Sequence, residues 1–421
     1  MSPELVLLLG SFALLVAIDA PIAVALGLSS VAYLAVADLA PLMVVAQRAV
    51  AGINSFTLLA IPLFLLAGLL MVRGGLAPRI VDLCAALIGR RTGGLAIVMI
   101  VACMLFGSLS GSGVADVVAI GTMMMPSMRE RGYAPGFSAA ALGCAGSLGT
   151  VIPPSIVLIV YGTATGTSIG DLFVAAIVPG ILLGIGLMIV AWAISRRNGW
   201  SGGQDFSWPA FWRALRRSVL ALLAPLIIVG GIRFGIFTPT EAAGIGVAYA
   251  LFVGALVYRS LSLRSVAEML RETTETTGAI LLVIASASVF GWILAAEQVP
   301  QLAVSGIDAT TDNWIVALLM MMAVVLVLGT FMEAIAIILI LAPVFMPVLD
   351  AYAIDPVHFG ILLTINLAIG ANTPPLGIDL MAACRTGNIP MSDSFRYLMP
   401  FLGVMIAVLG LIVVFPALMT L

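Results

Sequence analysis

The chain has 421 residues, of which 62% are hydrophobic and 9% are charged, and its net charge is −2. Its mean hydropathy of +1.23 excludes an ordinary soluble domain and predicts an all-α polytopic membrane protein. All 18 basic residues are arginines, and we expect no nucleic-acid partner and no cofactor. The apolar segment Leu5–Val16 follows no basic region, so no cleavable signal peptide is expected. The scattered cysteines and the single histidine, His358, are interpreted as structural.

In the first part of the chain, the apolar segment Leu5–Ala37 is interrupted at Asp19-Ala20-Pro21. It forms either one long tilted helix or two short ones. The next apolar run, Thr57–Val72, can cross the hydrocarbon region, which takes about 20 residues, with help from its flanks.

Two half-length segments follow, Gly94–Phe106 and Val114–Pro126, and they meet at the glycine- and serine-rich residues 107–113. This pattern predicts a re-entrant helical hairpin, 94–126. Ordinary helices kinked at glycine are the alternative interpretation.

The next segment, 137–165, is a helix interrupted by Gly149-Thr150-Val151-Ile152-Pro153-Pro154. Proline cannot donate a backbone hydrogen bond, and unpaired backbone groups are tolerated at membrane depth only where protein or a water-filled cavity satisfies them. We therefore predict a broken helix. A full span, Asp171–Ile194, and a polar linker, 200–216, follow it.

The second part of the chain has the same organisation, with a predicted hairpin at 314–347 whose arms meet at 329–332, and a broken helix at 357–384. Its predicted spans are Val219–Ile232, Glu241–Tyr258, Gly278–Ala296 and Tyr397–Leu418.

A repeat relates these two parts, because Gly149–Pro154 returns as Gly370-Ala371-Asn372-Thr373-Pro374-Pro375. The halves are residues 1–199 and 217–421. The chain crosses the membrane an odd number of times between equivalent points, which turns the second half upside down and predicts an inverted-topology repeat. Symmetry with Val219–Tyr258 favours two helices in Leu5–Ala37, with both chain ends outside.

The arginines indicate the orientation, because cytoplasmic loops carry an excess of positive charge. Arg90, Arg91, Arg129 and Arg131 flank the first hairpin, which should enter from the cytoplasm. The second hairpin is flanked by acids without a nearby arginine and should enter from outside. This tracing leaves only Arg48 and Arg233 outside.

Long strings of the sequence resemble the large membrane subunit of tripartite ATP-independent periplasmic (TRAP) transporters. They include Gly149–Ile156, Ser168–Phe173, Phe237–Ala243 and Thr373–Gly377, and the resemblance covers nearly the whole chain. It implies a sodium-driven importer of organic acids with the fold of elevator-type transporters in the ion-transporter superfamily. It also implies two partners, a small membrane subunit of about four helices and a periplasmic substrate-binding protein. The implied location is the bacterial inner membrane.

The sequence departs from this family at two positions. Gly113 stands where many relatives have serine, and Glu333 stands where aspartate is commoner. Outer-loop acids suit contact with basic patches on a binding protein, namely Asp38, Asp308, Asp312, Asp350 and Asp355.

The helix breaks and hairpin tips are the expected site. Sodium is a hard cation and should favour oxygen ligands. The first ion site is expected between a hairpin tip and a break, at Ser108, Ser110, Gly111, Gly146, Gly149 and Thr150. The second is expected at Gly329, Thr330, Glu333, Gly370 and Asn372. Serines and threonines that only pack helices together are the alternative.

A carboxylate substrate is expected between the two tips, where exposed N–H groups at half-helix ends can hold an anion. The predicted substrate contacts are Ser110, Ser112, Pro153, Thr330, Asn372 and Thr373. The sequence does not select among dicarboxylates, sialic acids, sugar acids and keto acids.

Five acids near the membrane have different expected roles. Asp116 and Glu333 are interpreted either as ion-coupling groups or as helix N-terminal residues. Glu241 is typical of a capping box, Asp379 lies near the second break, and Glu297 is an interfacial acid.

Competing functions are a channel and an intramembrane hydrolase. A channel needs a continuous polar path, and a serine nucleophile needs a base, which the sequence does not place near the tips. We therefore expect a transporter rather than an enzyme. The alternative within that class is a stand-alone sodium–carboxylate symporter that needs no binding protein.

Overall fold

A computed structural model describes residues 3–37, 39–88, 91–202 and 206–419, and nearly all of its regular structure is helical. The helices of the first half are α1 (Pro3–Ala17), α2 (Ile22–Val36), α3 (Met43–Ile53), α4 (Ala60–Arg73), α5 (Leu76–Ile88), α6 (Gly94–Ser110), α7 (Gly113–Glu130), α8 (Pro135–Gly146), α9 (Leu148–Val151), α10 (Ile156–Thr165) and α11 (Ile169–Asn198). Those of the second half are α12 (Trp208–Arg233), α13 (Pro239–Leu251), α14 (Leu263–Ala296), α15 (Val299–Asp308), α16 (Trp314–Gly329), α17 (Ala334–Ala351), α18 (Pro356–Gly370), α19 (Ile378–Gly387) and α20 (Phe395–Val414). Short helical turns cover Phe56–Leu59, Phe252–Val257, Met391–Ser394 and Pro416–Met419.

Within these described residues, seven helices are long and apolar enough to cross a membrane, or up to eight if a bent pair counts as one span. The structure therefore agrees with the polytopic membrane protein that the composition predicts. The bent pair is α8–α9 with α10, which turns by 41° at the first proline pair. Helix α17 also passes this test by length and composition, although the sequence assigns it to the second hairpin.

Two predicted spans begin earlier than their apolar residues do. Helix α12 starts at Trp208, inside the predicted linker, and α14 starts at Leu263 rather than near Gly278. The polar start of α14 carries ion pairs one turn apart, Arg264–Glu268 at 3.2 Å and Arg271–Glu275 at 2.8 Å. Such pairs support an exposed helix that hydropathy alone does not reveal.

The first apolar segment forms two helices, as symmetry favours. Helix α1 ends at Ala17, and α2 begins after Pro21, whose fixed φ suits the residue before a helix. The capping box at the start of α13 is also confirmed, because Thr238 and Glu241 exchange hydrogen bonds between side chain and backbone.

Three helices and one small sheet were not predicted from the sequence. Helices α3, α5 and α15 are short, and strands β1 (Arg91–Thr92) and β2 (Ser201–Gly202) pair antiparallel. This pairing joins the start of α6 to the end of α11.

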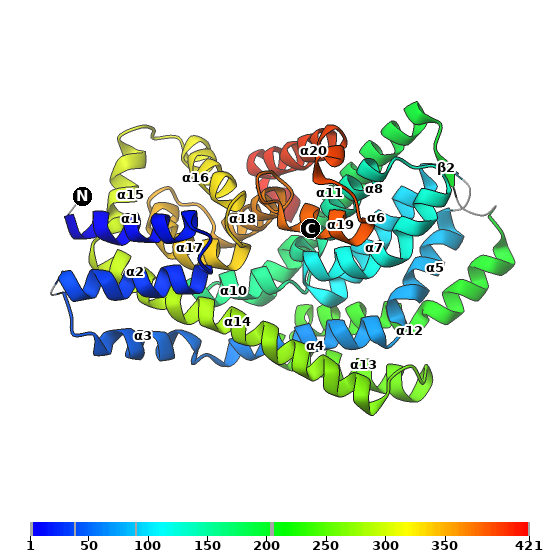
Figure 1. The fold of residues 1–421 in the computed structure, drawn as a ribbon, viewed down its shortest axis with the longest axis horizontal. Coiled ribbons are helices and arrows are strands. Elements are labelled where there is room, and N and C mark those ends of the chain that lie inside the picture. Colours follow the sequence, from blue (N-terminus) through cyan, green and yellow to red (C-terminus); the bar gives the residue numbers. More distant parts are fainter. Residues whose placement is uncertain (1–2, 38, 89–90, 203–205, 420–421) are drawn as a thin grey trace.

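In Figure 1 the long helix α14 runs beside α3 and α4 along one side of the molecule. Helix α14 is the longest, and it packs against α2, α3 and α4, while α13 packs against α4 and α12. We call α1–α5 and α12–α14 the frame helices. The central helices, α6–α11 and α16–α20, hold both predicted hairpins and both predicted helix breaks.

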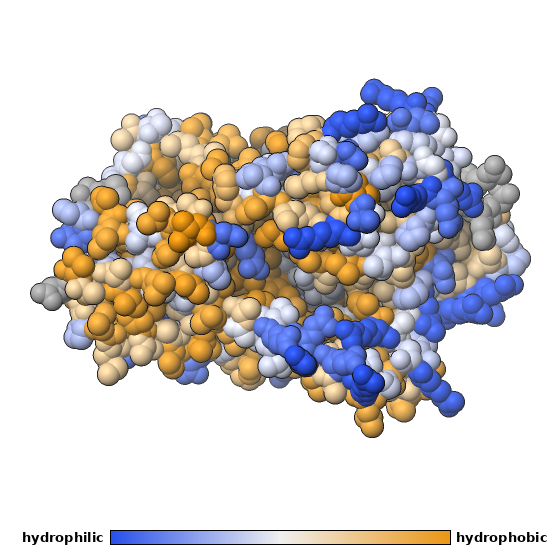
Figure 2. All heavy atoms as spheres, viewed as in Figure 1, coloured by the Kyte–Doolittle hydropathy of each residue, from blue (hydrophilic) through white to orange (hydrophobic). Residues whose placement is uncertain are grey.

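Much of the surface is apolar, and hydrophilic side chains gather toward the end of the molecule that holds the start of α12 (Figure 2). Frame helices expose large apolar side chains, including Val6, Leu14, Leu28, Val50 and Leu226. This distribution fits a lipid-facing or partner-facing exterior.

Candidate functional site

The tip of the first hairpin rests directly on the first helix break. Gly111 connects α6 to α7 with a φ of +64°, which favours glycine, and its carbonyl accepts the Ile156 N–H at 3.4 Å. A Cβ atom at Gly111 would lie 2.8 Å from the Pro154 carbonyl oxygen. The sequence thus places glycine where the tip turns against the break.

A glycine pair brings each hairpin against a break. A Cβ atom at Gly107 would lie 2.6 Å from the Gly149 Cα, so α6 and α9 touch backbone to backbone. In the second half, a Cβ atom at Gly370 would lie 2.8 Å from the Gly329 Cα. Corresponding residues of the repeat therefore make the same contact between α16 and α18.

A buried carboxylate fills the space at the first of these contacts. Asp116 is fully buried, and its Oδ1 accepts a hydrogen bond from Ser110 Oγ. Its Oδ2 has no hydrogen-bond partner among the described residues, and it would lie 2.0 Å from a Cβ atom at Gly149. Asp116 thus supplies an unpaired oxygen where the sequence predicts the first ion site.

The other hydroxyls of the predicted first site each bond to the backbone carbonyl three residues earlier. Ser108 Oγ donates to Leu105 O at 2.6 Å, and Thr150 Oγ1 donates to Ser147 O at 2.7 Å. Their oxygens retain free lone pairs.

At the predicted second site, Thr330 ends the first arm of the hairpin and Thr373 follows the break. Thr330 Oγ1 donates to Val327 O, and Thr373 Oγ1 donates to Ile369 O, each at 2.8 Å. The Leu376 N–H donates to Thr330 O at 3.3 Å, which ties the tip to the proline-rich segment. Glu333 directly precedes α17 and has an exposed side chain.

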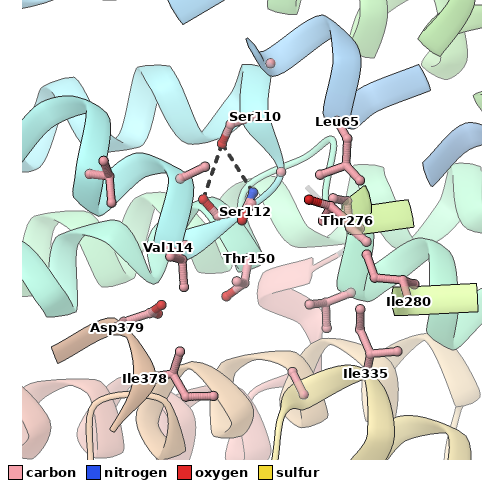
Figure 3. Close-up of a pocket in the computed structure, with 18 of the residues that line it drawn as sticks. Leu65, Ser110, Ser112, Val114, Thr150, Thr276, Ile280, Ile335, Ile378 and Asp379 are labelled. Carbon is pink, nitrogen blue, oxygen red and sulfur yellow. Dashed lines mark hydrogen bonds between the residues drawn. The ribbon is translucent and has the colours of Figure 1, made fainter. Parts of the chain in front are cut away.

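A cavity of about 710 Å³ separates these tips from the frame (Figure 3). Its lining includes five residues of the predicted ion and substrate sites: Ser110, Gly111, Ser112, Thr150 and Glu333. The remaining predicted site residues lie outside the lining: Ser108, Gly146, Gly149, Pro153, Gly329, Thr330, Gly370, Asn372 and Thr373.

Asn372, predicted as a substrate contact, is fully buried and turns toward the first half. Its Nδ2 donates to Ser147 Oγ and to Ala368 O. Ser147 Oγ in turn lies 2.7 Å from Asp379 Oδ2. The two breaks are therefore linked by a chain of three polar side chains.

The frame wall of the cavity was not anticipated from the sequence. It includes Arg73 of α4 and Glu272, Thr273 and Thr276 of α14. Arg73 pairs with Glu272 at 2.7 Å, and Thr273 Oγ1 is buried without a partner among the described residues. Because these residues lie far apart in the sequence and outside the repeat signature, only the packing of α14 on α4 brings them to the site.

The cavity holds more acidic than basic side chains. Its ionisable lining residues are Arg73, Glu272, Glu333 and Asp379. Arg73 is already paired with glutamates of α14. A carboxylate in this cavity would thus meet net negative charge.

Comparisons with known proteins agree with this architecture. The family model for "Tripartite ATP-independent periplasmic transporter, DctM component" matches residues 9–418. The chain is 40% identical to the isethionate TRAP transporter permease protein DctMQ of Oleidesulfovibrio alaskensis, over 97% of this chain and 65% of that relative. It is also 40% identical to the sialic acid TRAP transporter large permease protein SiaM of Vibrio cholerae, over 94% of this chain and 93% of that relative.

Among solved structures, the YdaH transporter of Alcanivorax borkumensis matches with a TM-score of 0.63 at 17% identity, covering 89% of each chain. At that identity the likeness concerns the fold alone. Together with the apolar helices, the sequence matches identify a multi-pass protein of the inner membrane. The chain belongs to the DctM-component family of tripartite ATP-independent periplasmic transporters, whose members are transport proteins rather than enzymes.

Proposed function

We propose that the protein is the large membrane subunit of a sodium-coupled importer of an organic acid. The observation that carries this proposal is the cavity between the central helices and the frame. It is lined by Ser110 and Ser112 of the first hairpin tip and by Glu333, which follows the second tip. Relatives of similar identity are permeases of isethionate, sialic acid and C4-dicarboxylate transporters. The substrate class is therefore an organic acid, and identity alone does not select one member.

Sodium coupling is supported by the charge around the cavity. A carboxylate gains little from Arg73, which two glutamates already engage, and it is repelled by Glu333 and Asp379. Cations bound together with the substrate would compensate that repulsion.

The proposed first ion site lies between the first tip and the first break, where Asp116 Oδ2, Ser110 and the backbone around Gly149 meet. The proposed second site is at the contact of Gly329 with Gly370, beside Thr330 and Glu333. Carboxylate, hydroxyl and carbonyl oxygens are suitable ligands for a hard cation. The substrate would then lie between Ser110, Ser112 and the second tip.

The proposed mechanism is an elevator movement of the central helices against the frame. It is supported by the equivalent glycine contacts of the two halves, which join each hairpin to a break within the central group. In an inverted-topology repeat, exchange between the two halves' arrangements opens the site to either side. The cavity between Ser112 and α14 would be one of these openings.

Two protein partners complete the proposal. A small membrane subunit would cover apolar frame surface, and a periplasmic binding protein would deliver the acid. The isethionate permease DctMQ is longer than this chain, which spans 65% of it. Exposed apolar side chains on α1–α3 and α12–α14 offer surface for the small subunit.

The function is tested by uptake into proteoliposomes that contain this chain and its co-expressed small subunit. A panel of isethionate, sialic acid and succinate is supplied with or without the cognate binding protein, in sodium or in choline. We expect uptake only with both sodium and the binding protein. Full uptake of free substrate by this chain alone would replace the tripartite proposal with the stand-alone symporter.

A further inference from the structure

A second buried carboxylate faces the cavity from the other helix break. Asp379 lies in the first turn of α19, is 3% exposed, and accepts a hydrogen bond from Ser147 Oγ at 2.7 Å. Ser147 stands between α8 and α9, so this bond joins the break of the first half to that of the second. Figure 3 shows Asp379 beside the same space as Thr150 and Val114.

Gly113 provides the room for this carboxylate. A Cβ atom at Gly113 would lie 2.7 Å from Asp379 Oδ2 and 3.1 Å from Oδ1. Helix α19 packs against α7, which begins at Gly113, and both residues line the cavity. Any residue with a Cβ atom at this position would occupy the space of the carboxylate. Glycine here and aspartate on α19 therefore fit each other.

In the described part of the chain, no basic side chain forms an ion pair with Asp379. The neighbouring Asn372 uses its Nδ2 to donate to Ser147, and its buried Oδ1 has no hydrogen-bond partner in the described part of the chain. The cluster thus contains more acceptor oxygens than donors. Burying a carboxylate in this way is costly unless it takes up a proton or a cation is bound with it.

We propose that Asp379, with Ser147 and Asn372, binds a monovalent positive charge that travels with the transported acid. This inference rests on the proposed function and deepens it. The charge is either sodium or the ammonium group of a zwitterionic substrate, because a carboxylate receives both. The site differs from the two proposed sodium sites, since it lies between the two breaks rather than between a tip and a break of one half.

The test measures binding through its effect on the stability of the folded protein. The complex with the small subunit is purified as wild type and as Asp379→Asn, and its thermal midpoint is followed as sodium chloride replaces choline chloride. A ligand of the folded state stabilises it in proportion to the logarithm of its concentration above the dissociation constant, so the slope reports the number of bound ions. β-Alanine and propionate, which differ by the ammonium group, are titrated in parallel.

If sodium occupies the site, the sodium slope of Asp379→Asn falls by one ion relative to wild type. If the ammonium of a substrate occupies it, the sodium slope is unchanged, β-alanine stabilises wild type more than propionate, and the variant loses that difference. Equal responses of both proteins to sodium and to β-alanine would overturn the inference and leave Asp379 a structural residue.

Gly113→Ala provides a second variant, because its Cβ displaces the Asp379 carboxylate without removing it. This variant should lose the same sodium slope or β-alanine preference as Asp379→Asn. It keeps the inference testable should Asp379→Asn not fold. Asp350→Asn, which neutralises an exposed acid at the end of α17, is the matched control and should match wild type. A wild type that ignores sodium would refute the proposed sodium coupling, whereas the β-alanine comparison still tests Asp379.

Discussion

Replacement of Gly149 by alanine tests the first ion site through its tightest contact. The new Cβ atom would lie 2.0 Å from Asp116 Oδ2 and 3.3 Å from Gly107 Cα. Non-bonded heavy atoms are most favourable at about 3.5 Å, so the carboxylate or the break must move by more than about 1 Å. Movement of that size breaks the hydrogen bond from Ser110 to Asp116.

The expected cost follows from these two effects. Overpacking a buried contact costs about 1–3 kcal/mol, and losing a hydrogen bond to a charged group costs about 1.5–3 kcal/mol. The same movement of the carboxylate or the break causes both effects, so their costs do not add in full. We therefore expect a total of about 2–3 kcal/mol. If Asp116 and the break hold sodium, this loss raises the half-saturating sodium concentration by about 30- to 150-fold, because 1.4 kcal/mol is tenfold.

The assay is substrate uptake into proteoliposomes as a function of sodium, with the amount of folded protein measured by size-exclusion chromatography. Gly278→Ala is the matched control, because its Cβ meets nothing within 4 Å. Alanine is favoured over glycine by about 0.5–1 kcal/mol inside a helix, so this control should fold at least as well as wild type. Wild-type sodium dependence in Gly149→Ala would refute the assignment of the first site.

The remaining predictions concern ligands, topology and partners. Ser110→Ala and Thr150→Ala should each raise half-saturating sodium more than they lower the amount of inserted protein, because each removes a hydroxyl oxygen from the proposed first site. Unchanged sodium dependence in both variants would contradict that site. Cysteines introduced at Asp308 and Arg129, in a background without native cysteines, should react with impermeant reagents from opposite sides, and labelling from one side would contradict the inverted repeat. The purified large subunit should gain sodium-dependent uptake only when the small subunit and binding protein are added, as measured by stepwise reconstitution.

The sequence predicted the central helices well because their interruptions have a chemical cause. Glycine and proline at Gly149–Pro154 and Gly370–Pro375 remove helix hydrogen bonds, and the structure ends helices at Val151 and Gly370. The first hairpin turns at Gly111, within the predicted tip. Strong local signals of this kind survive packing, so the positions of the breaks could be read without coordinates.

The frame helices were predicted less completely because they are stabilised by packing and ion pairs rather than by a local sequence signal. Helices α3 and α5 are short and lack the length that marks a span, while the start of α14 is polar and supported by ion pairs. Arg73 joins the site only because α4 packs on α14. Two residues used in the sequence predictions, Asp38 and Arg90, lie outside the described residues.

The glycines of the site explain how two buried carboxylates fit beside the helix breaks. Neither the repeat nor the charge pattern of the sequence predicts this arrangement. The sequence marks Gly149 as part of a helix break and Gly113 as a departure from serine. In the structure, Gly149 leaves space for Asp116 and Gly113 leaves space for Asp379. Each buried carboxylate thus lies against a glycine on a neighbouring helix and has no arginine to neutralise it among the described residues. In the proposed importer, a buried acid that stays ionised needs a bound cation, so the proposed cation binding depends on the same close helix contacts that these glycines permit.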